Sequence, residues 1–367
     1  MKKSRLLSLD IYRGIAIAFM IIVNTPGSWS YVYSPLRHSE WHGCTPTDLV
    51  FPSFLFIVGV SMWYSMKKYG HELNKRSLAK ILYRTSVIFL AGFLLGLFPF
   101  VGKDLSTVRI MGVLQRIALA YGFGAMICLL FRRKQLWGVS VIILVGYWAL
   151  LYFSGGDDPY SLEGNLALRV DRAIMGTKHL YKGFGIAFDP EGLLSTIPAI
   201  VTVIVGYMSG ELVGKGSING VNTLKMVIYG IGAIAIGLIW STVFPINKPL
   251  WTSTYVLFTA GISLILMAFL YLVVDVLKIG GWTGFFRVLG MNALFIYIMA
   301  GLWTMIMLMI RIPAGNESIT LYSWIYLKIC VPLLGNINGS LMFAIIQVLL
   351  MWGLGYILYR NKIFIKV

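Results

Sequence analysis

Long apolar runs separated by short polar stretches dominate the chain. A helix needs about 20 mostly apolar residues to cross a bilayer. Ten runs meet this length, at 7–25, 48–66, 81–99, 109–131, 136–153, 192–213, 224–244, 251–274, 286–310 and 339–359. A membrane β-barrel would instead show alternating segments about half as long. The pattern predicts an all-α polytopic membrane protein, with about ten transmembrane helices forming one domain over 1–367.

The composition agrees with this fold class. Apolar residues make up 58% of the chain and charged residues 12%, whereas soluble domains average about 45–50% and about 25%. These values exclude a soluble enzyme, a disordered protein and a disulfide-rich secreted scaffold. The first run contains Asp10 and Arg13 and no small-residue cleavage site follows it, so we expect a retained helix. The stretch 319–335 is short and centred on Lys328, and we expect an outer interfacial segment there.

Charge predicts the orientation, because lysine and arginine favour cytoplasmic loops. With the N-terminus inside, the inner segments carry 19 of the 31 basic residues and the outer segments carry 10. Ten of the 14 acidic residues then lie outside, so nearly all of the net charge of +17 faces the cytoplasm. Both termini are predicted to be cytoplasmic, and the long outer loops are 25–47, 154–191 and 311–338. Basic inner loops set topology, contact anionic lipid, or attract an anionic cytoplasmic ligand.

Several kinds of site have no signature in the sequence. The three cysteines lack the spacing of a disulfide framework or a zinc site, and no phosphate-binding loop or HExxH motif occurs. We therefore expect no metal and no nucleic-acid partner. Gly206, Gly210 and Gly214 are spaced so that two helices can pack closely. This spacing permits a homodimer without predicting one.

The outer loop that joins the first two helices has the highest density of reactive side chains. His38 and Asp48 lie there, with Asn24 at the end of the first helix and Trp41 among several aromatic residues. A histidine can accept and return a proton near neutral pH, and an adjacent carboxylate would fix its tautomer. The alternatives are that Asp48 only caps a helix and that the aromatic residues only form an interfacial belt.

Polar side chains inside the apolar runs form a second group. A charge at the bilayer centre is costly, so such residues usually face protein or water. Arg13 can pair with Asp10 on one helix face. Arginine also grips phosphates through its planar fork, which makes the arginines at different depths candidates for a polar passage. These candidates are Arg13, Arg84 and Arg116, which follows Gln115, and such a passage fits a transporter as well as a transmembrane enzyme. The amide of Asn292 either bonds a neighbouring helix or contacts a ligand.

Polar residues of the later outer loops form a third group. Asp189 and Glu191 precede the sixth run in the sequence FDPEG, and His179 lies upstream. Asn247 and Lys248 mark another outer turn. Acidic residues at a helix N-terminus can be stabilised by the helix dipole alone. The functional alternative is recognition of a cationic or hydroxyl-rich substrate.

Taken together, these residues resemble the heparan-α-glucosaminide N-acetyltransferase family and its bacterial relatives over essentially the whole chain. The matching motifs, in order, are SLDIYRG at 8–14, Val23-Asn24, His38, W-x-G-x-T-x-x-DLVFP at 41–52, VLQR at 113–116, HLY at 179–181, DPEG at 189–192, PINKPLW at 245–251, GMN at 290–292 and ILYRNKIF at 357–364. The order and spacing of all these motifs carry the resemblance.

The resemblance implies an acyltransferase that moves acetyl from cytoplasmic acetyl-CoA to the amine of a glucosamine-type sugar on the outer side. Asn24, His38 and Asp48 match the catalytic centre of the family. His38 would act as the base or would carry the acetyl group, and Asn24 would steady the thioester oxygen. The donor-binding candidates are Arg13, Arg84, Gln115, Arg116 and Asn292, and the acceptor-binding candidates are Trp41, His179, Asp189, Glu191, Asn247 and Lys248.

We expect a multi-pass protein of a bacterial inner membrane with acetyl-CoA, an amino sugar and membrane lipid as partners. The competing hypothesis from another class is a transporter for glucosamine or N-acetylglucosamine. Transporters often contain inverted repeats with broken helices, and no such repeat is evident in the sequence. A non-catalytic membrane partner is a third hypothesis, which His38 and its neighbours disfavour.

Overall fold

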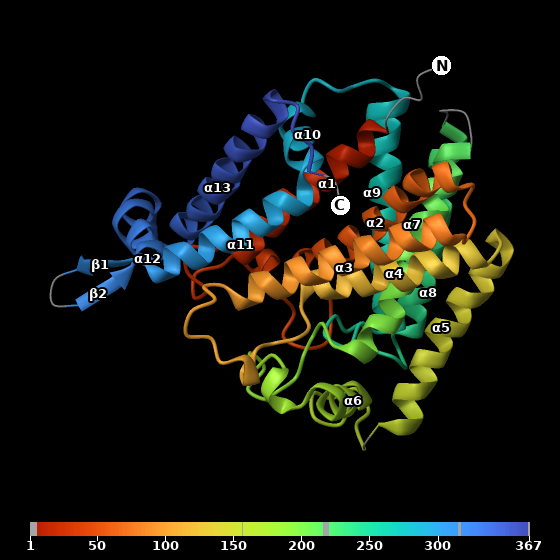
Figure 1. Ribbon diagram of the computed structural model, residues 1–367, viewed down its shortest axis with the longest axis horizontal. Helices are drawn as coiled ribbons and strands as arrows, with labels where there is room; N and C mark the ends of the chain where they lie inside the picture. Colours follow the sequence, from red (N-terminus) through yellow and green to blue (C-terminus); the bar gives the residue numbers. More distant parts are fainter. Residues whose placement is uncertain (1–5, 156, 216–219, 315–316, 366–367) are drawn as a thin grey trace. The chain divides into compact units, whose positions relative to one another are not determined.

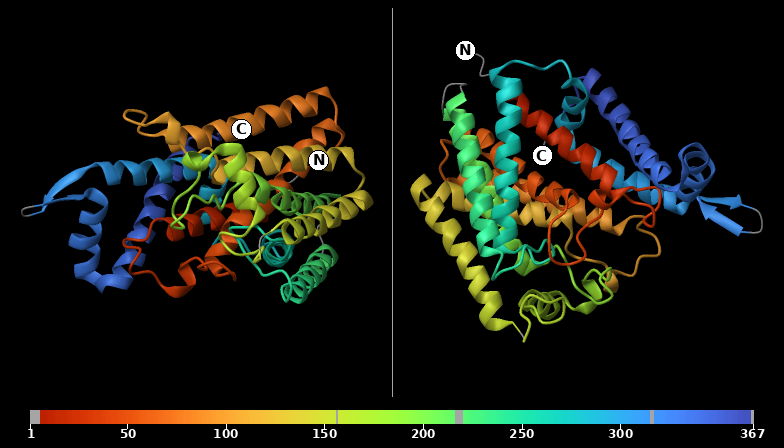
Figure 2. Two further views of the ribbon diagram at one scale, coloured as in Figure 1. Left: turned by 90° about the horizontal axis from the view of Figure 1, so that it is seen from below. Right: turned by 180° about the vertical axis from the view of Figure 1, so that it is seen from behind.

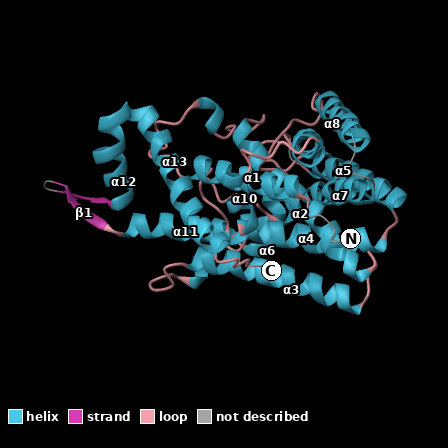
Figure 3. Ribbon diagram, turned by 90° about the horizontal axis from the view of Figure 1, so that it is seen from above, coloured by secondary structure: helices cyan, strands magenta, loops and turns pink. Residues whose placement is uncertain are grey.

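The computed structural model describes residues 6–155, 157–215, 220–314 and 317–365. In these ranges nine helices are long and apolar enough to cross a membrane, and one bent helix pair brings the number to ten. The prediction of an all-α polytopic membrane protein with about ten spans is therefore confirmed. Figure 3 shows one small β-hairpin among the helices of this part of the chain.

The chain forms two compact units. Figure 1 labels their helices and strands. The first unit contains the described parts of Met1–His38, Thr45–Val50 and Ile279–Lys366. The second unit contains the described parts of Ser39–Cys44 and Phe51–Lys278. The first two apolar runs thus contribute to different units, because the boundary falls at the start of the second helix.

The first unit is built mainly of helices from the two ends of the chain. Its elements are α1 (Leu7–Asn24), two 3₁₀ turns (Ser34–Leu36 and Pro46–Leu49), α10 (Gly284–Met291), α11 (Ala293–Met309), β1 (Arg311–Ala314), β2 (Glu317–Thr320), α12 (Leu321–Ile325), a π-helical turn (Tyr326–Cys330) and α13 (Val331–Arg360). Close packing of α1 on α10 depends on two glycines. A Cβ atom on Gly14 would lie 1.8 Å from the carbonyl oxygen of Phe286, and one on Gly290 would lie 1.9 Å from that of Asp10.

One feature of this unit differs from the expectation. The run 286–310 forms two helices, α10 and α11, that bend by 83° at Asn292. The segment 319–335 is largely helical and continues into α13, which contains a kink at Gly335, where φ is 73°. Glycine tolerates this left-handed backbone because it lacks a Cβ atom. The interfacial position of the segment stays a prediction. The hairpin before this segment pairs Arg311 with Thr320 in antiparallel register.

The second unit contains the remaining spans. Its elements are α2 (Val50–Met66), 3₁₀ turns at Lys67–Tyr69, Leu105–Thr107 and Thr177–His179, α3 (Lys75–Leu97), α4 (Val113–Leu130), α5 (Arg133–Ser154), α6 (Leu166–Met175), α7 (Leu193–Lys215), α8 (Gly220–Trp240), α9 (Ser253–Leu270) and a π-helical turn (Tyr271–Val276). The largest apolar core packs residues of α2, α4, α7 and α9 together. Figure 2 shows α8 and α9 lying side by side in both views.

The glycine stripe of α7 packs against α2 as its spacing predicts. A Cβ atom on Gly206 would lie 2.1 Å from the carbonyl oxygen of Phe56, and one on Gly214 would lie 1.9 Å from the ring of Trp63. Small residues at this spacing let helix backbones approach closely in a membrane. The stripe is therefore occupied by a helix of the same chain.

Candidate active site

The loop between α1 and α2 presents His38 through a network of local hydrogen bonds in the first unit. The Arg37 Nε atom donates to the carbonyl oxygen of Val32 at 3.0 Å. The Thr47 hydroxyl donates to the carbonyl oxygen of Pro35 at 3.2 Å. These bonds fold the loop back on itself, so the segment before His38 lies against the 3₁₀ turn that contains Asp48.

His38 and Asp48 are in direct contact. The Nδ1 atom of His38 lies 2.6 Å from Oδ1 of Asp48, within the range of a charge-assisted hydrogen bond. The Asp48 side chain is 1% exposed, whereas the His38 side chain is 43% exposed. A buried carboxylate thus holds the Nδ1 edge of an accessible imidazole. This arrangement fixes the tautomer of the histidine.

Thr45 holds the second oxygen of the same carboxylate. Its backbone N–H donates to Oδ2 of Asp48 at 3.0 Å. Its hydroxyl lies 3.1 Å from that oxygen and 2.7 Å from the carbonyl oxygen of Arg37. Asp48 therefore helps to cap the 3₁₀ turn Pro46–Leu49 and also contacts His38. The capping role and the predicted catalytic role are compatible with each other.

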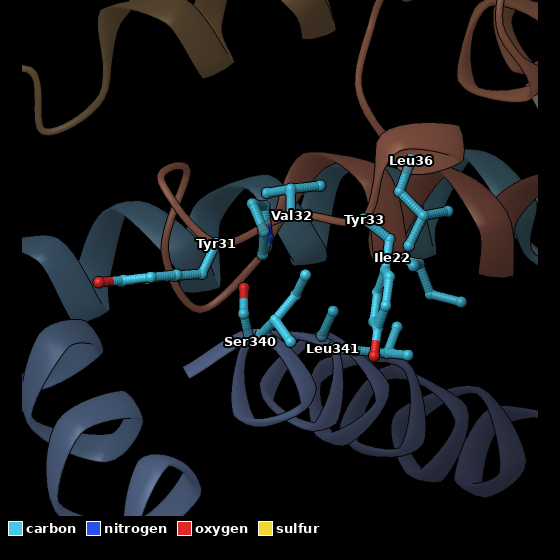
Figure 4. Close-up of a pocket in the computed structure, with 10 residues that line it drawn as sticks. Ile22, Tyr31, Val32, Tyr33, Leu36, Ser340 and Leu341 are labelled. Carbon is cyan, nitrogen blue, oxygen red and sulfur yellow. The ribbon is translucent and has the colours of Figure 1, made fainter. Parts of the chain in front are cut away.

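Asn24, the third predicted catalytic residue, is the last residue of α1 and is exposed. The loop that follows it forms a small apolar pocket with the start of α13. This pocket holds about 240 Å³ of empty space between the segments 22–36 and 337–344. Figure 4 shows the loop crossing over Ser340 and Leu341. The catalytic role of Asn24 stays a prediction.

Trp41 and Asn247 lie together in the second unit. The Nδ2 atom of Asn247 donates to the carbonyl oxygen of Trp41 at 3.0 Å and lies 3.3 Å from Nδ1 of His42. The indole of Trp41 donates to the carbonyl oxygen of Tyr160 at 2.8 Å. Both residues thereby join segments that are far apart in sequence. Their contacts with a substrate stay predictions, as do those of Lys248, whose carbonyl oxygen accepts from the Trp251 N–H.

Asp189 and Glu191 share a partner that the sequence analysis did not single out. Arg109 donates from Nε and Nη2 to the two carboxylate oxygens of Asp189, at 2.8 and 2.7 Å. It also donates from Nη2 to Glu191. Burial lowers the pKa of Arg109, but its bonds to the two carboxylates more than offset this and raise the pKa above its ordinary value. The negative charge of FDPEG is thus engaged inside the protein.

His179 supports the same cluster. Its Nδ1 atom lies 2.7 Å from the carbonyl oxygen of Val108, and its own carbonyl oxygen accepts from the N–H of Ile110 at 3.3 Å. These two contacts hold the backbone on either side of Arg109. His179, Asp189 and Glu191 therefore converge on one segment, and their recognition of an acceptor stays a prediction.

The cap of α7 is Asp171, which the sequence analysis also missed. Its Oδ1 atom accepts from the N–H groups of Leu193 at 2.9 Å and Leu194 at 3.4 Å. Burial raises the pKa of Asp171 to about 6, although these two bonds and Arg116 act in the opposite direction. The capping alternative offered for FDPEG thus applies to a different carboxylate, 18 positions before Asp189 in the chain.

The candidates for binding the anionic donor already have structural contacts. The Nη1 atom of Arg13 lies 3.0 Å from Oδ1 of Asp10, which confirms the expected i, i+3 pair. Asn292 donates to the carbonyl oxygen of Ile363 at 3.1 Å and accepts from the N–H of Ile365 at 2.9 Å. Gln115 is buried and approaches Gly92 of α3.

Two further arginines lie over aromatic rings in the second unit. The guanidinium of Arg84 lies 4.6 Å from the ring centroid of Tyr121. That of Arg116 is fully buried, lies 4.8 Å from the ring of Trp251 and donates to Ser195. In the described ranges the Nε and Nη1 atoms of Arg116 have no hydrogen-bond partner. Phosphate binding by these arginines stays a prediction.

Comparison with known proteins gives the family. The family model described as heparan-alpha-glucosaminide N-acetyltransferase, catalytic, matches residues 5–216. The human protein named heparan-alpha-glucosaminide N-acetyltransferase is 29% identical in an alignment that covers 99% of this chain and 60% of the human protein. The mouse protein of the same name is 27% identical, over 99% of this chain and 61% of the mouse protein.

The chain thus spans about three fifths of the length of the curated relatives it matches. The resemblance seen in the motifs is confirmed, since the family model covers more than half of the 367 residues. The chain belongs to the heparan-alpha-glucosaminide N-acetyltransferase catalytic family.

Proposed function

We propose that this protein is a transmembrane N-acetyltransferase. It takes acetyl from cytoplasmic acetyl-CoA and gives it to the amine of a glucosamine-type sugar on the opposite side of a bacterial inner membrane. Family membership supports acyl transfer. The single observation that supports the site is the 2.6 Å contact between His38 and Asp48, with the carboxylate buried and the imidazole accessible.

In the first form of the mechanism, His38 is a general base. An ammonium group has no lone pair for attack, so the Nε2 atom of His38 takes a proton from it. The amine nitrogen then attacks the thioester carbonyl, the carbon–sulfur bond breaks, and the CoA thiolate leaves. Asp48 stabilises the imidazolium through Nδ1. The proton on His38 then neutralises the thiolate, and the second proton that the acylated nitrogen must lose goes to water, so charge and protons balance.

In the second form, His38 carries the acetyl group. The Nε2 atom attacks the thioester, CoA leaves as the thiolate, and an acetyl-imidazole remains. The acceptor ammonium loses one proton to water, the resulting amine attacks this acetyl group, and the released imidazole takes the second nitrogen proton. The CoA thiolate takes its proton from solvent. Ping-pong kinetics and a burst of CoA release would distinguish this route from direct transfer. Both routes use the same Nδ1 contact, so the observed pair supports them equally.

The remaining candidates have supporting roles in this proposal. The amide of Asn24 would donate to the thioester oxygen as negative charge develops there. Arg13, Arg84 and Arg116, with Gln115 and Asn292, would bind the phosphate-rich CoA. In the described ranges, two guanidinium nitrogens of Arg116 have no hydrogen-bond partner. This favours a contact between Arg116 and a ligand. Trp41, His179, Asp189, Glu191, Asn247 and Lys248 would bind the acceptor.

The test is an assay of purified full-length protein with acetyl-CoA, with and without glucosamine. We expect release of free CoA thiol together with N-acetylglucosamine, detected by mass. His38→Asn should abolish product formation, whereas the matched variant His71→Asn should not, because His71 contacts Tyr207 and Trp63 instead.

Two outcomes would contradict the proposal. Wild-type turnover by folded His38→Asn protein would show that the site is wrong. If folded wild-type protein released no thiol, acyl transfer itself would be wrong and a transporter would become the better hypothesis.

A further inference from the structure

A groove in the second unit lies apart from all the candidate residues described above. Its floor is one face of α7, made by Val205, Met208, Ser209 and Leu212. These positions follow the i, i+3, i+4, i+7 pattern of a single helix face. Val205 and Leu212 are seven residues apart, so the floor extends about 10 Å along the helix axis.

Two aromatic side chains form the walls of this groove. Trp137 projects from α5 and Tyr229 from α8, with ring centroids 6.1 Å apart. Their side chains are 49% and 44% exposed. Beyond Trp137, the α5 face continues with Val141 and Ile142, which are 57% and 72% exposed. In a membrane-spanning helix such an apolar face contacts hydrocarbon.

The floor behaves as an apolar surface although it contains a serine. The Ser209 hydroxyl donates to the carbonyl oxygen of Val205 at 2.7 Å, which satisfies it within its own helix. Ser209 and Met208 are also almost fully buried by the surrounding side chains. The Ser209 hydroxyl therefore needs no water as a hydrogen-bond partner, and the floor is chemically compatible with a hydrocarbon chain.

The mouth of the groove is positively charged. Arg133 lines it at the start of α5, with Nε 3.8 Å from Oε2 of Glu211. The other oxygen of Glu211 lies 2.6 Å from Nζ of Lys215. Two cations thus share one carboxylate, and Arg132 and Lys134 add exposed positive charge beside Arg133.

We propose that this groove binds one anionic glycerophospholipid from the adjoining leaflet. The phosphate contacts Arg133 at the mouth, and one acyl chain lies along the groove against the exposed surfaces of Trp137 and Tyr229. Charge complementarity selects an anionic headgroup, because each basic residue near an anionic lipid surface adds about fivefold to binding. This site is independent of the acyltransfer chemistry, so it can be tested whether or not the proposed activity holds.

The test uses full-length protein in micelles that contain equal amounts of phosphatidylglycerol and phosphatidylcholine. Native mass spectrometry counts the lipids retained by each chain. We expect wild-type protein to retain one phosphatidylglycerol with at least about fivefold preference. Arg133→Gln should remove the preference, and Trp137→Ala should lower retention of both lipids because it opens one wall.

The matched controls are Lys278→Gln and Trp282→Ala, which remove one basic and one indole side chain at exposed positions outside the groove. Retention equal to wild type in these controls would support the proposal. It would be overturned by wild-type protein without preference for phosphatidylglycerol, or by folded groove variants that retain it as wild type does. Equal losses in the controls, or a lipid-free dimer with the groove buried between two copies, would also overturn it.

Discussion

The backbone nitrogen of Thr45 lies 3.0 Å from Oδ2 of Asp48, and the hydroxyl oxygen of the same threonine lies 3.1 Å from that carboxylate oxygen. The opposite oxygen of Asp48 faces His38 at 2.6 Å. A carboxylate held on one side in this way cannot rotate without breaking these bonds. The position of the imidazole therefore depends on a residue that need not touch a substrate.

Thr45→Val tests this positioning role. The variant loses the hydroxyl but keeps the backbone bond, so we expect kcat to fall about tenfold, the effect of one hydrogen bond to a charged group. The KM for acetyl-CoA should not change. Thr45→Ser should restore most of the activity because it restores the hydroxyl. Steady-state kinetics measures both values, and an unchanged kcat in folded Thr45→Val protein would show that the hydroxyl does not position Asp48.

Arg109→Gln should destabilise the second unit. The substitution removes the cation shared by Asp189, which is fully buried, and Glu191, whose side chain is 12% exposed. Breaking a buried ion pair costs about 3 kcal/mol, so the apparent melting temperature in detergent should fall by several degrees. Arg169→Gln is the control, since Arg169 is exposed on α6. An equal loss in both variants would mean that the cluster contributes no special stability.

The raised pKa of Asp171 predicts an unusual pH dependence of the protein's stability. Its pKa is about 6 in the folded protein and 3.8 in the reference state, so between these values the folded protein binds more protons. The free energy of unfolding therefore falls as pH rises from about 4 to about 6. The raised pKa corresponds to about 3 kcal/mol lost over this range.

Asp171→Asn provides the comparison. The amide oxygen can still accept from the N–H groups of Leu193 and Leu194, but it carries no charge at any pH. We expect its melting temperature to change less than that of the wild type between pH 4 and pH 6, and to be higher at pH 7. Thermal scans across this range decide the point, and parallel curves would show that Asp171 does not titrate there.

Gly14→Ala should weaken the packing of α1 on α10. The added Cβ atom would lie 1.8 Å from the carbonyl oxygen of Phe286, so the two helices must separate. Overpacking of this kind costs about 1–3 kcal/mol. Gly353→Ala is the matched control in a helix, because a Cβ atom there meets no heavy atom within 4 Å. A melting temperature of Gly14→Ala equal to that of the control would contradict this packing.

The fold was predictable where apolar side chains alone determine the structure. The ten runs correspond to the helices because hydrocarbon selects long apolar segments. The boundaries were less accurate, as in α3, which begins at Lys75 rather than at residue 81. Asn74 caps this helix by accepting from the N–H groups of Arg76 and Ser77. Its basic first turns lower the local hydropathy although they are helical.

The bend at Asn292 could not be predicted from hydropathy, since the residues on both sides of it are apolar. Its signal was the amide itself, which the sequence analysis treated as a binding residue. The same analysis predicted the proximity of His38 and Asp48, which are ten positions apart and lie in one loop.

Contacts between distant segments were harder to predict. Arg109 lies 80 positions before Asp189, and it was counted only as one outer-loop charge. The available signal was charge balance, because FDPEG places two acidic residues close together and so favours a nearby cation. Asp171 was missed because no local pattern links it to a helix that begins 22 positions later.

The bend at Asn292 also constrains how the protein is made. Its side chain bonds to the backbone of Ile363 and Ile365, which the ribosome delivers only after α11, α12 and α13 have been synthesised. Until then, the break between α10 and α11 lacks both partners in an apolar environment, where unmet backbone and amide groups are costly. The corner can therefore close only after the segment that follows α13 has been synthesised.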